Sequence, residues 1–383
     1  MTDQSGNKTA KRNDGIDLLR GISIVLVIMT HLAIRIPLAK TLATAILPMP
    51  LIDVLCSRGY SSVFVFFVIS GFLITGNALR RWGSLGQLQL LPFYTRRFAR
   101  IVPCLLVLVA LLSVLDLAHV RFYTILPANQ SLPGAIFAAL FMHLNWYEGR
   151  TGYLPGNWDV LWSLSIEEAF YLGFPLVCLL SRRSMIPFVV CLALLALSLP
   201  IMRGAIVGHE IWRKYAYLPG IAAIATGVFA ALCAYRWRPT GATPLWLTLV
   251  GATSYAGFML GGNLIWPVLG QASVLLLTIG VAALLLGLHW RDLPRWALYG
   301  TGSLRAFGRL SYEVYLSHMA VVFSAVQLFR GFGIDERWGF LFYPPVLALA
   351  LSLGWTIARF VSQPAERWLL TRTSSERSAA IAF

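Results

Sequence analysis

Long apolar segments recur along the whole chain, each close to the roughly 20 residues that a helix needs to cross the hydrocarbon core of a bilayer. Short polar or basic stretches separate them. Because backbone polar groups in lipid must find hydrogen bonds within the chain, the expected fold is an all-α, polytopic membrane helical bundle. The pattern predicts ten transmembrane helices, near residues 16–36, 60–79, 101–119, 161–181, 185–202, 215–234, 244–262, 266–288, 305–328 and 343–362.

One apolar segment, Leu132 to Trp146, is too short for a comfortable crossing and is predicted to be re-entrant or interfacial. The distribution of basic residues supports leaving it out of the count. With ten spans, both termini share one side of the membrane with 21 of the 31 lysines and arginines, and the other 10 lie opposite. Basic residues accumulate on the cytoplasmic side, so both termini are expected to be cytoplasmic, in a multi-pass protein of the inner (plasma) membrane.

The amino-acid composition is typical of an integral membrane protein. It is 58% hydrophobic and only 12% charged, against roughly 25% charged residues in soluble domains. The net charge of +15 would suit nucleic acid, but the basic residues lie in short clusters beside apolar runs, which is a topology signal, so the expected partner is the lipid bilayer and no nucleic acid. The predicted division is a disordered cytoplasmic leader, a transmembrane domain and a cytoplasmic tail, over residues 1–14, 15–372 and 373–383.

The first span carries two polar side chains, Arg20 and His31. Eleven residues of helix place them about 20° apart on one face and about 16 Å apart along the axis. Asp17, three residues before Arg20, can pair with it. Ionisable groups inside a span usually face a cavity, which favours a function for His31. The alternative is that His31 hydrogen-bonds a neighbouring helix while Arg20 extends to the lipid headgroups.

The fourth span contributes two adjacent acids, Glu167 and Glu168, in the stretch "WDVLWSLSIEEAFYL". Both are predicted near the depth of His31. A carboxylate beside an imidazole can fix its tautomer and raise its basicity. Adjacent helical side chains point about 100° apart, so only one of the two can face a given cavity and the other is expected to be structural.

A basic cluster precedes the third span, where Arg96, Arg97 and Arg100 lie within one and a half helical turns. One interpretation is a charge cluster that only sets topology. The other is a site for an anionic cytosolic ligand, because guanidinium groups bind phosphate bidentately. His318, later in the chain with Glu313, is interpreted as a helix-packing residue rather than a second element of a site. The sequence has no H-E-x-x-H or similar ligand spacing, so no metal is predicted.

Together these segments resemble the acyltransferase-3 family of membrane acyltransferases. The resemblance runs over some 300 residues in the family's order and rests on five stretches, "GIDLLRGISIVLVIMTHL", "FVFFVISGFLITGNALRR", "YTRRFARIVP", "LWSLSIEEAFYL" and "LSYEVYLSHM". Unlike some family members, the chain is expected to have no C-terminal soluble domain. Transfer is therefore expected from the membrane domain itself.

The resemblance implies transfer of an acyl group from a cytosolic acyl-CoA, usually acetyl-CoA, to a hydroxyl of a carbohydrate, a lipid-linked glycan or a secreted small molecule. His31 matches the family's essential histidine, and Arg20, Arg97 and Arg100 match the arginines expected to engage the donor. Phosphates cannot enter hydrocarbon, which fits a donor held at the basic cytoplasmic mouth. Glu167 is expected to orient His31 or to stabilise its charge.

The function predicted from the sequence is therefore an acetyl-CoA-dependent O-acyltransferase acting on a glycan of the bacterial envelope. His31 serves either as the catalytic base or as the acyl carrier, and the sequence does not separate these routes. The rival is a transporter or flippase for an acylated or anionic solute, in which His31 and the glutamates form a proton relay. The sequence shows none of the inverted repeats typical of many transporters.

Overall fold

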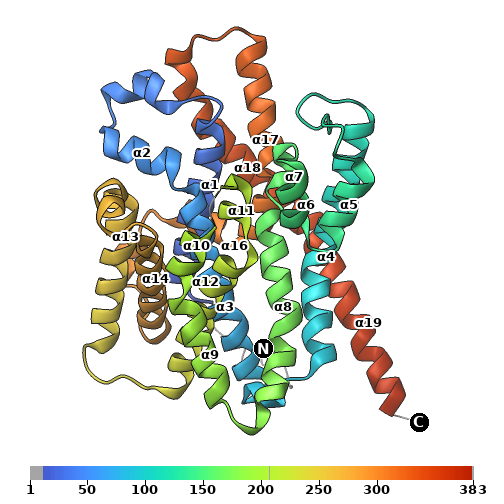
Figure 1. Cartoon of the computed structure of the whole chain (residues 1–383), viewed down its shortest axis with the longest axis vertical. Coiled ribbons are helices and arrows are strands. Elements are labelled where there is room, and N and C mark those ends of the chain that lie inside the picture. The colour runs from blue at the N-terminus through green and yellow to red at the C-terminus, as the bar shows by residue number, and fades with distance from the viewer. Residues whose placement is uncertain (1–11, 207, 382–383) are drawn as a thin grey trace.

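The computed structural model describes residues 12–206 and 208–381, and within them every regular element is a helix (Figure 1). This confirms the predicted all-α bundle. The helices are α1 (Asp14–Ala33), α2 (Met49–Ser57), α3 (Gly59–Trp82), α4 (Leu90–Leu117), α5 (Leu132–Leu140), α6 (Leu144–Thr151), α7 (Gly156–Asp159), α8 (Trp162–Leu180), α9 (Ile186–Leu197), α10 (Leu199–Ala205), α11 (Glu210–Tyr215), α12 (Tyr217–Arg236), α13 (Thr243–Leu269), α14 (Ala272–Trp290), α15 (Arg295–Leu298), α16 (Gly302–Arg309), α17 (Ser311–Gly331), α18 (Tyr343–Ile357) and α19 (Gln363–Ile381).

Eight helical segments of the described chain are long and apolar enough to cross a membrane, and a ninth is formed if α9 and α10, bent by 50°, make one span. The predicted span near residues 305–328, which corresponds to α17, is not among these segments. This helix has 21 residues, but polar side chains such as Glu313 and His318 make it less apolar than the others. The structure thus places a helix at each of the ten predicted positions and supports eight or nine spans on length and hydropathy. Which membrane face holds the termini stays a prediction.

The segment from Leu132 forms two short helices, α5 and α6, with a left-handed residue, Met142 at φ 61°, between them. Neither helix is long enough to cross a bilayer, in agreement with the sequence-based prediction. At the C-terminal end, α19 continues through the predicted tail, whose backbone is helical to Ile381. Most of the predicted leader, residues 1–11, lies outside the described residues.

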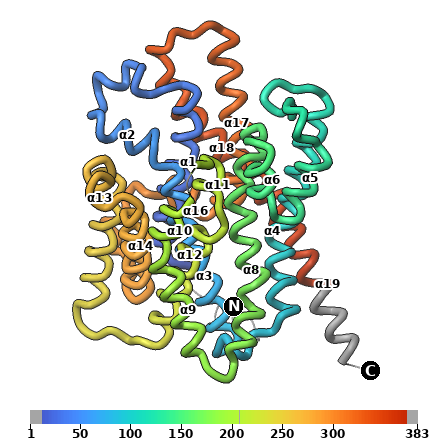
Figure 2. The backbone as a smooth tube through the Cα atoms, viewed as in Figure 1, coloured from blue at the N-terminus to red at the C-terminus, as the bar shows by residue number. Residues whose placement is uncertain are grey.

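The centre of the bundle depends on close helix crossings, while α13 and α14 form an antiparallel pair at one side (Figure 2). Where α3 crosses α12, a Cβ added at Gly71 would lie 2.1 Å from the carbonyl oxygen of Ile224. A Cβ added at Gly227 would lie 1.9 Å from that of Val68. Small residues allow membrane helices to approach backbone to backbone. These two glycines therefore allow α3 and α12 to pack backbone to backbone.

Substituting Gly227→Ala is expected to destabilise the protein, because the new methyl group overlaps a backbone oxygen that cannot move aside. Overpacking of this kind costs about 1–3 kcal/mol or more. The melting temperature of the purified protein in detergent should fall clearly below that of wild type. The matched control is Gly257→Ala on α13, where a Cβ meets nothing within 4 Å. Equal melting temperatures for the two variants would contradict this packing.

Candidate active site

The first helix holds Arg20 against the start of α17. Nη2 of Arg20 donates a hydrogen bond to Oγ of Ser311 at 2.7 Å. The expected partner of Arg20 is bonded elsewhere, since Oδ1 of Asp17 accepts from Nη2 of Arg12 at 3.0 Å. Asn13 caps the helix by accepting from the backbone N–H of Gly15 at 2.9 Å. Arg20 is therefore held across a helix–helix boundary and not by its own helix.

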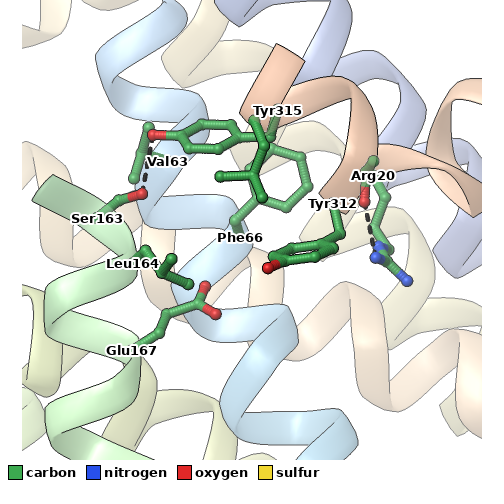
Figure 3. Close-up of a pocket in the computed structure, with 10 residues that line it drawn as sticks. Arg20, Val63, Phe66, Ser163, Leu164, Glu167, Tyr312 and Tyr315 are labelled. Carbon is green, nitrogen blue, oxygen red and sulfur yellow. Dashed lines mark hydrogen bonds between the residues drawn. The ribbon is translucent and has the colours of Figure 1, made fainter. Parts of the chain in front are cut away.

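The side chain of Arg20 lines an internal cavity of about 100 Å³ between α1, α3, α8 and α17, which we call the inner cavity. Figure 3 shows that Glu167 and Tyr312 point into the same space from α8 and α17. On one side of it, Oγ of Ser163 donates a hydrogen bond to the hydroxyl of Tyr315 at 2.8 Å (Figure 3). This inner cavity therefore has an arginine and a glutamate at one part of its wall and a hydroxyl pair at another.

Two further cavities adjoin the inner one. A middle cavity of about 170 Å³ shares Arg20 and Glu167 with it and is also lined by Arg97 and Arg100. A mouth of about 380 Å³ shares Arg97 and Arg100 with the middle cavity and adds Arg96. The mouth lies where the end of α3, the start of α4 and the start of α19 meet. The arginines that the sequence singled out are thus brought together along one path into the bundle, which narrows from the mouth inwards.

Glu167 lies on the side of this path that holds the arginines. Its Oε2 accepts from the hydroxyl of Tyr171 at 3.1 Å, and that hydroxyl is also hydrogen-bonded to Ser70. The guanidinium of Arg97 lies 4.1 Å from the centre of the Tyr171 ring. Glu168 is buried, lines none of these cavities and leaves its Oε1 without a partner among the described residues. Only one of the two acids faces the path, as their 100° separation requires.

His31 has a second histidine as its neighbour. The ring centres of His31 and His318 are 5.3 Å apart. Nδ1 of His318 lies 2.7 Å from the backbone oxygen of Tyr315. Because a carbonyl oxygen can only accept, Nδ1 carries the proton and Nε2 is left as an acceptor. Nε2 is buried and has no partner among the described residues, so the pair contains an imidazole nitrogen free to bind a proton.

The sequence interpretation of His318 as a packing residue missed this proximity. The signal that was present is its position in the "LSYEVYLSHM" stretch, one of the five on which the family resemblance rests. Spacing along a single helix could not show that the two histidines meet, because His31 and His318 lie 287 residues apart in the sequence, on different helices. The expected contact of Glu167 with His31 stays a prediction, since the hydrogen bond described for Glu167 is with Tyr171.

The histidine pair separates the inner cavity from the other end of the bundle. On one side, the ring of Tyr315 lines the inner cavity and its centre is 5.8 Å from that of His318. On the other side, Nη1 of Arg35 donates to the backbone oxygen of His31 at 2.8 Å, and Arg35 lines a groove that opens at the far end. The two histidines therefore lie between Tyr315 of the inner cavity and Arg35 of the groove.

The comparisons with known proteins agree with this arrangement. Residues 13–359 match the acyltransferase-3 family model, described as an acyltransferase domain. The chain belongs to the acyltransferase-3 family. The matched range contains the arginines that line the cavities, both histidines of the pair, and Glu167 and Glu168, and the bundle that carries them is a multi-pass membrane domain of this family.

Two relatives show what kinds of protein are similar to this acyltransferase-3 member. It is 31% identical over 213 residues to peptidoglycan O-acetyltransferase OatA of Listeria monocytogenes, a stretch that covers 54% of this chain and 29% of the relative. It is 29% identical over 241 residues to O-acetyltransferase OatA of Staphylococcus aureus, covering 59% of this chain and 35% of the relative. The aligned part is about a third of each relative's length. No solved structure matches the chain.

Proposed function

We propose that this chain is a membrane O-acetyltransferase that moves an acetyl group from cytosolic acetyl-CoA to a hydroxyl of an envelope glycan. The observation that carries the proposal is the path of three adjoining cavities, which runs from an arginine-lined mouth to an inner cavity whose wall includes Tyr315, the ring neighbour of His318. Family membership and the O-acetyltransferase relatives support the reaction class. The inner membrane is the proposed location, because a cytosolic donor and an envelope acceptor meet there.

The residues at the mouth fit an anionic donor. Arg96, Arg97 and Arg100 converge there, and Glu366 is the one acid among the described residues that line the mouth. Planar guanidinium groups form paired, charge-assisted hydrogen bonds with phosphate oxygens. Phosphates are too costly to bring into hydrocarbon, so the nucleotide part of acetyl-CoA would be held at this mouth. Arg20, deeper along the path, would meet the thioester arm.

His31 would act at the inner end. A neutral imidazole takes the proton from the acceptor hydroxyl while the hydroxyl oxygen forms a bond to the thioester carbonyl carbon. The carbon–sulfur bond breaks, and the imidazolium returns the proton to the leaving thiolate. In the alternative route His31 itself takes the acetyl group before passing it on. His318 would act as a positioning residue for His31, because the two rings are 5.3 Å apart and Nε2 of His318 has no partner among the described residues.

Glu167 is proposed to act on the donor side. Its hydrogen bond to Tyr171 and its place in the cavity wall with Arg20 and Arg97 suit a carboxylate that orients the arginines. The narrowing of the path favours a transferase over the transporter alternative, because the cavities shrink from about 380 to 170 and 100 Å³. A thin acyl arm suits such a path better than a glycan or a lipid headgroup would.

The test uses sealed vesicles of known orientation containing the purified protein. Acetyl-CoA supplied at the face that bears the arginine mouth is expected to acetylate a glycan acceptor confined to the opposite face. Free CoA should appear only where the donor was added. Mass spectrometry measures the product and a thiol reagent measures the CoA.

The control for this test is the same vesicles with donor and acceptor exchanged between the faces, for which no product is expected. Product formed only when both substrates share one compartment would contradict transfer through the bundle. Movement of an intact solute without consumption of the thioester would favour the transporter.

A further inference from the structure

A groove of about 790 Å³ lies at the end of the bundle opposite the arginine mouth. Three arginines from distant parts of the chain line it, Arg35 just after α1, Arg121 just after α4 and Arg330 in the last turn of α17. None of the described residues that line the groove is an aspartate or a glutamate. The groove is therefore strongly positive, although it lies on the side where the charge count predicts fewer basic residues.

The other basic residues on this side are mostly neutralised or hydrogen-bonded. Arg203 is buried and donates to Gln271 at 2.9 Å. Among the described residues, none of the ion pairs includes an arginine of the groove. The ion pairs on this side are Lys40–Glu336, Arg58–Asp53, Lys214–Glu210 and Arg337–Asp335. The three groove arginines are left with charge that no side chain compensates directly.

The acids nearest to the groove do not cancel its charge. Asp159 lies close enough to Arg35 to interact with it electrostatically, but its Oδ1 accepts from the hydroxyl of Tyr215 at 2.8 Å. Glu148 is fully buried beside Asp159. Burial and the neighbouring Asp159 carboxyl raise the pKa of Glu148 well above its usual range, which favours its uncharged form. Three positive charges therefore face at most one fixed negative charge.

Aromatic side chains and a strained backbone accompany the arginines. The rings of Phe122 and Phe323 stack with centres 5.2 Å apart and an angle of 11°. Arg35 lies 4.6 Å from the centre of the Phe323 ring, and Arg121 lies 5.1 Å from that of Phe122. Phe122 and His119, which both line the groove, adopt left-handed φ angles of 73° and 52°. Such angles are costly for large side chains, and they concentrate at functional sites.

We propose that this groove binds an anionic group of the acceptor, a carboxylate or a phosphate carried by the glycan. Arg121 and Arg330 hold the charge, and the stacked pair Phe122–Phe323 offers an apolar wall to a sugar ring. Arg35 couples the groove to the catalytic helix through its hydrogen bond to the backbone oxygen of His31. The inference deepens the proposed function and rests on it for the identity of the ligand as the acceptor.

A purely structural role for the same arginines makes a different prediction. Helices α1, α4 and α17 all end at this groove, and cations near helix C-termini compensate the helix dipole. Arg35 does this for α1. If Arg121 and Arg330 did no more, their removal would lower the melting temperature and leave ligand preference unchanged.

The experiment measures binding to the full chain in lipid nanodiscs without donor. The probes are a disaccharide that ends in a uronic acid, its uncharged methyl ester, and the same disaccharide bearing a phosphate monoester. The variants are Arg121→Gln, Arg330→Gln and the double variant. The control is Arg337→Gln, an exposed arginine on the same side that pairs with Asp335 outside the groove.

Wild type is expected to bind the better of the two anionic probes about tenfold or more tighter than the ester, a preference that weakens with salt. The double variant should lose this preference, and Arg337→Gln should keep it. Tighter binding of the phosphate or of the uronate identifies the anion, and either result supports the groove. Equal binding of charged and uncharged probes, a preference that survives the double variant, or no binding of either anionic probe at millimolar concentration overturns the inference.

A second measurement separates this inference from the proposed function. With acetyl-CoA present, release of CoA and acetylation of each probe are followed. Equal acetylation of charged and uncharged glycans would remove the groove's role while the transferase stands. Arginine-dependent binding of the anionic probes without any consumption of acetyl-CoA would support the groove as a binding site and contradict the proposed transferase function.

Discussion

Acetyl transfer by a His31→Ala variant is expected to fall by about 10²- to 10⁴-fold, the usual contribution of a general base. The loss follows from removing the imidazole beside His318, which in turn neighbours Tyr315 in the wall of the inner cavity. The fold should persist, because the hydrogen bond from Arg35 goes to the backbone oxygen of His31 and does not need the side chain. The measurement is the rate of acceptor acetylation by purified protein supplied with acetyl-CoA.

The matched control is His209→Ala, which removes an exposed histidine before α11, outside the cavities described here. It should keep the wild-type rate, and both variants should keep the wild-type melting temperature. A His31→Ala protein that transfers acetyl at the wild-type rate would remove this residue from the chemistry. A variant that loses activity together with its fold would indicate a packing role for His31 instead.

The double variant Arg97→Lys with Arg100→Lys is expected to weaken acetyl-CoA binding by about 10- to 100-fold. Lysine keeps the positive charge that orients the chain, but it cannot make the paired hydrogen bonds of a guanidinium. One such bond to a charged group contributes about 1.5–3 kcal/mol, which gives the expected range. Calorimetric titration of the purified protein with acetyl-CoA measures the affinity.

A second arginine pair at the same end of the bundle provides the control. Arg182 and Arg183 follow α8, are exposed and line none of the cavities described here. Replacing both with lysine should leave the affinity unchanged. If the Arg97–Arg100 double variant also bound acetyl-CoA as wild type does, the cluster would serve membrane topology alone.

The sequence by itself determined the helices and the register within each of them. Hydrophobicity over about 20 residues decides whether a segment crosses a bilayer, and this property is local. The same holds for the short segment at Leu132, which forms two helices too short to cross. Spacing along one helix also identified Arg97 and Arg100 as neighbours, and both line the middle cavity and the mouth. Spacing along one helix was not always sufficient, since Asp17, which was expected to pair with Arg20 on the first helix, is bonded to Arg12.

The tertiary structure alone decided which residues of different helices meet. Depth in the membrane suggested that Glu167 lies near His31, but depth does not define lateral position, so this contact stays a prediction. His318 reaches His31 only because α17 packs against α1. Contacts between helices depend on how whole side-chain surfaces fit together, and no short stretch of sequence contains that fit.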